Sequence, residues 1–275
     1  MITRLMKYLM TSLIAFYCLS CQTSRNPTAT LQHRDYLILL SDIDIMDVDP
    51  LGNLYIVDGN ERLTKCDSTA IRQFHIVNTN LGDVHSIDVG NPFKIMMFYR
   101  DQQTILLLDK TLSEIQRIQL PDWGVADITA ACLAPDNAIW IFNGTKKTLV
   151  KMDDSGNAIL TSDPFDMIGP GAIRPDFILD TDNYLILSEH NNPISLFNDF
   201  GNYVRDLSEI PTSFSMAENK LIYQKENRIL SYDLTSQRYF PELKMTESSP
   251  QKLYAFGDHY YSVDPKGIYV ISLVK

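Results

Sequence analysis

Residues Gly52–Asp67 read GNLYIVDGNERLTKCD, two short apolar runs separated by polar turn residues and closed by an aspartate. The runs are rich in Ile, Val, Leu and Tyr, which favours strands over helices. The stretch therefore predicts two paired strands. Whether it recurs decides the architecture of the chain.

The plan of this stretch occurs six times along the 275 residues. The first five copies, beginning with IDIMDVDPLGNLYIVDGNERLTKCD and VHSIDVGNPFKIMMFYRDQQTILLLD, end their third strand at Asp67, Asp109, Asp153, Asn198 and Asp233. Successive spacings of 42, 44, 45 and 35 residues are typical of the four-stranded blades of a β-propeller. Runs such as KIMMFY do not alternate, which predicts burial on both faces, as in a blade between two neighbours.

The two ends of the repeat array complement each other. The sixth copy, QKLYAFGDHYYSVDPKGIYVISL, lacks its outermost strand, whereas RDYLILLSD at Arg34–Asp42 is an apolar strand without a blade. Pairing the two would close the ring and leave no open sheet edge. The sequence predicts an all-β, six-bladed β-propeller over residues 33–275, closed by an N-terminal strand, with a seven-bladed or irregular propeller as the alternative.

DPLGNLYIVD and the strand endings LVKMDDSGNAI and ISLFNDFGNYV are similar to NHL-type six-bladed propeller repeats, notably those of Bacteroidota lipoproteins. The resemblance covers nearly the whole chain after the first 32 residues and implies the fold. It implies little about activity, because propellers host binders, lyases, hydrolases and sensors.

The first twenty residues have the layout of a secretory signal, with Arg4 and Lys7 before an apolar run and Ser20 at its end. CLSC at Cys18–Cys21 resembles a bacterial lipobox, which makes Cys21 the expected lipidation site; ordinary signal cleavage is the alternative. We expect residues 1–20 to be a signal peptide and 21–32 a lipidated cysteine with a flexible tether. Gln22–Asn26 contains no acid, which by family analogy favours the periplasmic face of the outer membrane over the cell surface.

The net charge limits the classes of binding partner, and the cysteine positions bear on whether a disulfide forms. The formal net charge of −10 becomes −12 without Arg4 and Lys7, so the surface repels phosphates and we expect no nucleic-acid partner. The apolar runs are too short for a transmembrane helix. Cys66 and Cys132 fall on different strand types of non-neighbouring copies, so we expect no disulfide between them.

Candidate binding residues lie in the loops that enter each innermost strand and in the hairpins between second and third strands, because a propeller brings these segments to one face. The candidates are Asp44, His85, Asp127, Arg174, Asp176, Glu189 and His190. Asp44, Asp127, Asp176 and His85 could converge as an acid, base or metal set. Aspartates more often cap turns, and Arg174 would place positive charge beside a cation. We therefore expect no metal and no cofactor.

Trp123, in LPDWGVAD, is the candidate interface anchor; packing over a neighbouring blade is the alternative. The sequence contains no GxSxG, HExxH or CxxC motif, so we assign no catalytic residue.

These observations predict a periplasmic lipoprotein, anchored in the outer membrane through Cys21, that acts as a non-enzymatic protein-binding scaffold. An accessory of outer-membrane assembly or secretion machinery is one such scaffold, by fold analogy only. The alternative is a propeller enzyme or carbohydrate-binding protein with a small-ligand or metal site in its central channel.

Overall fold

The computed structural model describes residues 35–169, 173–181, 183–208, 213–225, 228–244, 252–257 and 259–271. Residues 1–32, which we expect to form the signal peptide, the lipidated Cys21 and the tether, lie outside the described part of the chain. In the part of the chain that is described, no helix is long and apolar enough to span a membrane.

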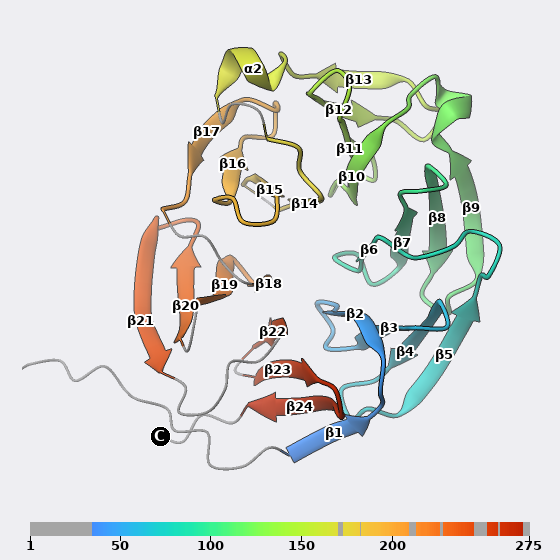
Figure 1. Cartoon of the computed structure of the whole chain (residues 1–275), viewed down its shortest axis with the longest axis vertical. Coiled ribbons are helices and arrows are strands. Elements are labelled where there is room, and N and C mark those ends of the chain that lie inside the picture. The colour runs from blue at the N-terminus through green and yellow to red at the C-terminus, as the bar shows by residue number, and fades with distance from the viewer. Residues whose placement is uncertain are drawn as a thin grey trace, which may run out of the picture.

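Six four-stranded antiparallel sheets surround a central axis, as predicted (Figure 1). Blade 1 comprises β2 (Ile43–Val48), β3 (Leu54–Asp58), β4 (Arg62–Cys66) and β5 (Arg72–Val77). Blade 2 comprises β6 (Ser86–Asp88), β7 (Lys94–Tyr99), β8 (Thr104–Asp109) and β9 (Glu114–Gln119). Blade 3 comprises β10 (Ile128–Leu133), β11 (Ile139–Asn143), β12 (Thr148–Met152) and β13 (Ala158–Thr161).

The second half of the ring repeats this plan. Blade 4 comprises β14 (Phe177–Asp180), β15 (Leu185–Ser188), β16 (Ser195–Phe197) and β17 (Tyr203–Asp206). Blade 5 comprises β18 (Ser213–Ala217), β19 (Lys220–Lys225), β20 (Arg228–Asp233) and β21 (Arg238–Lys244). Blade 6 comprises β22 (Lys252–Phe256), β23 (His259–Asp264), β24 (Gly267–Ile271) and β1 (Asp35–Leu39). Two short helices, η1 (Leu120–Trp123) and α2 (Phe165–Ile168), join blades 2 to 3 and 3 to 4.

The N-terminal strand closes the ring. β1 is the outermost strand of blade 6 and pairs antiparallel with β24, with Asp35 opposite Val270 and Leu39 opposite Gly267. The Tyr36 hydroxyl also donates a hydrogen bond to Asp264 in β23 (2.7 Å). The predicted closure is confirmed, and both ends of the repeat array share one sheet.

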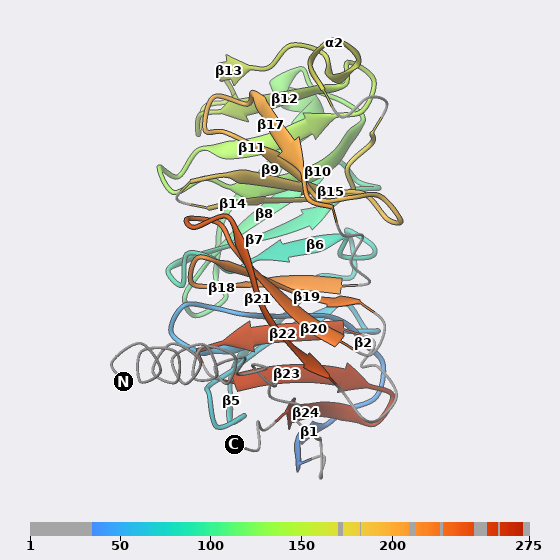
Figure 2. The ribbon, with the colours of Figure 1, turned by 90° about the vertical axis from the view of Figure 1, so that its left-hand side faces the viewer.

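The hydrophobic core lies between adjacent blades, which stack face to face around the axis (Figure 2). All residues of β10 and β11 are buried, as the non-alternating apolar runs predicted. Phe165 of α2 fills the junction of blades 3 and 4, with its ring 4.8 Å from that of Phe197 and 5.0 Å from that of Phe142. Cys66 and Cys132 are buried and unpaired.

The acid or amide that ends each third strand explains the repeat signature. One Asp109 oxygen accepts the backbone N–H groups of Thr111 (2.8 Å) and Ser113 (2.9 Å), which closes the turn into the fourth strand. Asp67, Asp153 and Asn198 accept two turn amides in the same way. Side-chain oxygens that bind nearby backbone amides favour turns over continued strand. The repeat is thus visible in the sequence because each copy needs the same local turn.

Candidate functional site

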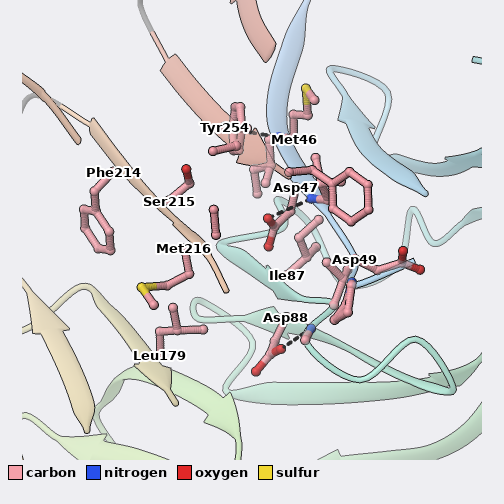
Figure 3. A pocket seen from close by; sticks show the side chains of 18 of the residues that line it. Met46, Asp47, Asp49, Ile87, Asp88, Leu179, Phe214, Ser215, Met216 and Tyr254 are labelled. Atoms are coloured by element: carbon pink, nitrogen blue, oxygen red, sulfur yellow. Dashed lines mark hydrogen bonds between the residues drawn. The ribbon is translucent and has the colours of Figure 1, made fainter. Parts of the chain in front are cut away.

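A cavity of about 590 Å³ occupies the centre of the ring (Figure 3). It is lined by the innermost strands β2, β6, β14, β18 and β22 and by the turns that follow four of them. The innermost strand of blade 3, β10, is fully buried and does not contribute to the lining. The cavity is therefore asymmetric, although the blades around it repeat.

Strand register defines one layer of equivalent positions around this cavity. Asp47, Asp88, Cys132, Leu179, Ser215 and Tyr254 lie opposite Tyr55, Met96, Trp140, Ile186, Ile222 and Tyr261 of the second strands. In the first five blades each of these second-strand residues also pairs with a third-strand residue. That third-strand residue always lies two positions before the Asp or Asn that marks the end of the third strand in the repeat. The same repeat position thus carries a polar side chain in blades 5, 6, 1 and 2, and an apolar or thiol side chain in blades 3 and 4.

Asp47 is the least satisfied carboxylate of this layer. Val48 N–H donates to its Oδ1 (2.8 Å) and is the one hydrogen-bond donor that the described residues supply. The pKa of Asp47 is raised to about 7, chiefly by burial. The hydrogen bond from Val48 acts to lower this pKa, and the neighbouring charges of Asp88 and Asp49 act to raise it.

Asp88 occupies the same position in the next blade and is only 7% exposed. Its two oxygens accept the backbone N–H groups of Gly90 (2.9 Å) and Leu133 (2.8 Å), so it also ties β6 to β10. Burial raises the pKa of Asp88, although both amides act to lower it. Two carboxyl groups of raised pKa therefore stand on adjacent blades.

Asp49 lies near this pair but serves its own turn. It accepts the N–H groups of Leu51 and Asn53, the Asn53 amide and the Tyr55 hydroxyl at 2.8 to 3.2 Å. The aspartate that lies outside the inner strand thus has a structural role. Asp47 and Asp88 are the carboxylates with capacity toward the cavity.

The other two polar members of the layer continue the arc. The Tyr254 hydroxyl accepts Met46 N–H (3.4 Å), and burial followed by the charge of Asp47 raises the pKa of Tyr254. The Ser215 hydroxyl oxygen is buried without a hydrogen-bond partner among the described residues. Figure 3 shows Asp47 and Asp88 on one side of the cavity, Ser215, Met216 and Leu179 on the other, and Tyr254 beside Met46.

We compared this arrangement with known proteins. No family model and no curated protein matches the chain. Virginiamycin B lyase from Staphylococcus aureus, a catalytically inactive variant solved with quinupristin, is 15% identical with a TM-score of 0.58, over 87% of this chain and 88% of that one. A streptogramin B lyase is 15% identical with a TM-score of 0.57, over 88% of each chain. The WD40 domain of Neurospora crassa Pan2 is 8% identical with a TM-score of 0.60, over 89% of this chain and 83% of that domain.

These likenesses concern the fold. The chain is a six-bladed β-propeller whose fold is similar to that of virginiamycin B lyase.

The channel-face residues expected from the sequence lie at the end of the ring where the innermost strands begin. Arg174 and Asp127 form an ion pair (2.6 Å), and the other Asp127 oxygen accepts the Thr145 hydroxyl (2.8 Å). Glu189 accepts Arg174 N–H (3.2 Å) and the Asn192 amide (2.8 Å), which ties the hairpin of blade 4 to this pair. Asp127, Arg174 and Glu189 therefore come together as a polar network.

The remaining candidates are placed differently. The His85 ring nitrogen Nε2 lies 2.8 Å from the Asp176 carbonyl oxygen, and burial lowers the pKa of His85. The Asp44 backbone carbonyl oxygen accepts a hydrogen bond from the Lys252 ammonium group. His190 is exposed in the β15–β16 hairpin. Among the described residues no group of three or more His, Cys, Asp or Glu side chains is close enough to hold a metal ion.

Trp123 is half-buried against the core of blades 2 and 3. A Cβ on Gly156, in the β12–β13 turn, would lie 2.5 Å from the Trp123 ring, so the indole covers that glycine. The structure places Trp123 in contact with the neighbouring blade.

Asp47 and Asp88 were not among the residues singled out from the sequence; of those that were, His85 lines the same cavity. Asp47 and Asp88 both precede a valine near the end of a first strand, in IMDVD and SIDVG. Alignment of the copies on the Asp that follows or ends the third strand would have placed them at one repeat position. Without strand register they resemble the turn aspartates around them.

Proposed function

We propose that this chain is a binding protein whose central channel receives a small, largely apolar ligand. The observation that supports this is the cavity of about 590 Å³, which falls within the roughly 300–1,000 Å³ of small-molecule sites. Its walls include Ile45, Ile87, Leu179, Phe214 and Met216. A few polar groups at one level within apolar walls are the usual composition of such a site.

The test uses Nile red, a neutral dye whose fluorescence rises in apolar surroundings. We expect saturable binding at one dye per chain. The double variant Leu179→Trp/Met216→Trp fills the cavity and should weaken this binding at least tenfold, because Leu179 and Met216 both line it. The volume-conserving variant Leu179→Met/Met216→Leu is the control and should bind within about twofold of wild type. Unchanged dye affinity in the folded tryptophan variant would exclude the channel as the site.

We also propose that the protein works as a lipoprotein, anchored through Cys21 to the periplasmic face of the outer membrane. The support is the lipobox-like CLSC at Cys18–Cys21 and the acid-free Gln22–Asn26. Two hydrocarbon chains or more at one site give stable anchoring. The polar residues 22–32 would let the propeller stand away from the bilayer.

Docking of a protein partner is the second candidate function. Leu51, in the β2–β3 turn, and Phe93, in the β6–β7 turn, are 63% and 64% exposed on the same face, near the cavity rim. Exposed apolar side chains beside a cavity suit a protein interface.

Crosslinking in intact cells, followed by membrane fractionation, tests the membrane anchor and the docking of a protein partner together. We expect wild type in the membrane fraction, with a captured membrane-associated protein that is lost in Leu51→Glu/Phe93→Glu. Cys21→Ser should move the chain to the soluble fraction. Retention of Cys21→Ser on membranes would refute the anchor, and capture that is indifferent to the glutamates would refute this docking face.

A further inference from the structure

The charge inside the cavity has one sign. Asp47, Asp49, Asp88 and Glu218 line it, whereas among the described residues no lysine or arginine does. The Asp49 oxygens are occupied by their own turn. A ligand with a carboxylate or phosphate would meet like charge in a poorly solvated space, which is costly.

The polar arc also has acceptor capacity that the described residues leave unused. Asp47 receives one hydrogen bond from the described residues, that of Val48, and the Tyr254 hydroxyl already accepts Met46 N–H. The Ser215 oxygen, in the same repeat layer, is buried with no partner among the described residues. A ligand group that donates several hydrogen bonds and carries positive charge complements all of these positions.

The apolar arc determines the rest of the ligand. Leu179 and Met216 lie across the cavity from Asp47, on the same side as Phe214 (Figure 3). Phe177 also lines the cavity. The rings of Phe177 and Phe214 meet edge to face at 5.3 Å, which fixes a rigid apolar surface. A hydrocarbon or aromatic body would bury its area against this wall.

A metal ion is the other cation class, and the geometry favours an organic cation instead. Calcium requires six to eight oxygen ligands. The described residues hold no group of three acidic, histidine or cysteine side chains at metal distance. Each Asp88 oxygen already accepts one backbone amide, so Asp47 and Asp88 together offer fewer oxygens than calcium requires.

We propose, building on the channel-binding function above, that the ligand is a small amphipathic amine. Its ammonium group lies between Asp47 and Asp88, on the side of the cavity that Tyr254 adjoins, and its apolar body lies along Leu179, Met216 and Phe214.

Three probes of equal chain length test the headgroup: octylamine, octanol and octanoate, each titrated against Nile red bound to the full chain at pH 8. We expect octylamine to displace the dye at a concentration about tenfold below that of octanol, as a hydrogen bond to a charged group implies, and octanoate to be weakest. Asp47→Asn should bring octylamine within about twofold of octanol, and because both probes are titrated against the same variant, this ratio does not depend on how tightly the variant binds Nile red. Asp101→Asn, exposed in the β7–β8 hairpin, is the matched control and should keep the preference for the amine.

The outcomes separate the two proposals. Equal displacement by the three probes, or a preference for octanol or octanoate, overturns the amine assignment and leaves the channel as an apolar site. Absence of channel-dependent Nile red binding overturns the channel function, and the amine assignment with it. An amine preference that persists in both Asp47→Asn and Asp88→Asn also overturns the placement of the headgroup.

A second readout comes from pH. Octylamine binding should weaken as the pH falls from 8 to 5.5, because Asp47 takes up a proton around pH 7, whereas octanol binding should not change. The other titratable groups that line the cavity are Asp49, Asp88, Glu218, His85 and Tyr254. Asp47→Asn should remove most of the pH dependence, and its full retention in that variant would contradict the role of Asp47.

Discussion

Gly267→Ala is expected to open the ring. Gly267 begins β24 with φ +145°, a backbone region that residues with a side chain rarely adopt, and a Cβ there would overlap the Ile38 carbonyl oxygen of β1. The backbone clash cannot be relieved by a rotamer change, so β1 must move away from β24. Loss of the packing of Tyr36, Leu37 and Ile38 costs roughly 3–6 kcal/mol, and we expect Tm to fall by about 10 °C or more.

Circular dichroism melts and size-exclusion chromatography measure this effect. Gly124→Ala is the control, because Gly124 also has a positive φ, +71°, but a Cβ there would meet no atom within 4 Å beyond its chain neighbours. That variant bears the conformational penalty without the collision. Deletion of residues 35–39 should behave like Gly267→Ala and add aggregation through the exposed edge of β24. Similar melting of the two glycine variants would show that β1 contributes little to closure.

The fold was predictable because its signals are local. Asp67, Asp109 and Asp153 each close a turn with their own side chains, so each copy shows the same residue at the same place without knowledge of the rest of the chain. Ring closure was predictable for a different reason. The sixth copy lacks its outermost strand, and the apolar strand at Arg34–Asp42 belongs to no copy, so the sequence itself indicates that the two pair.

The candidate site was less predictable because its residues meet only through the ring. Asp47 and Asp49 are two positions apart, yet Asp49 has four hydrogen bonds from its own turn and Asp47 has one. Their surroundings in the sequence are alike. What separates them is the set of amides that each can reach and, for Asp47, the neighbouring side chain of Asp88 from the next blade, 41 positions away. The residues chosen from the sequence, such as Asp127 and Arg174, do meet, but they neutralise each other in an ion pair.

Asp47→Asn is expected to stabilise the protein above neutral pH. The pKa of Asp47 rises from 3.8 to about 7 on folding, chiefly through burial. A raised carboxyl pKa contributes stability below the unfolded value, and that contribution is lost as the pH rises through the folded value. The asparagine variant carries no such charge. Its advantage should grow from near zero at pH 4 to its full size above pH 7, about 2–4 kcal/mol, or roughly 5–10 °C in Tm.

Thermal unfolding of both proteins between pH 4 and pH 8 measures the difference, which must be taken at each pH because other carboxyl groups titrate in the same range. Hydrogen bonds from their own turns lower the pKa of Asp67 and Asp153, so those groups destabilise both proteins equally at low pH. Asp101→Asn, at an exposed hairpin position, controls for the loss of one carboxylate from the surface. A flat difference for Asp47→Asn would mean that Asp47 is solvated in the channel. A rising one would show that the ring holds an ionised carboxylate at a cost in stability, which is the condition under which a cationic ligand would stabilise the fold.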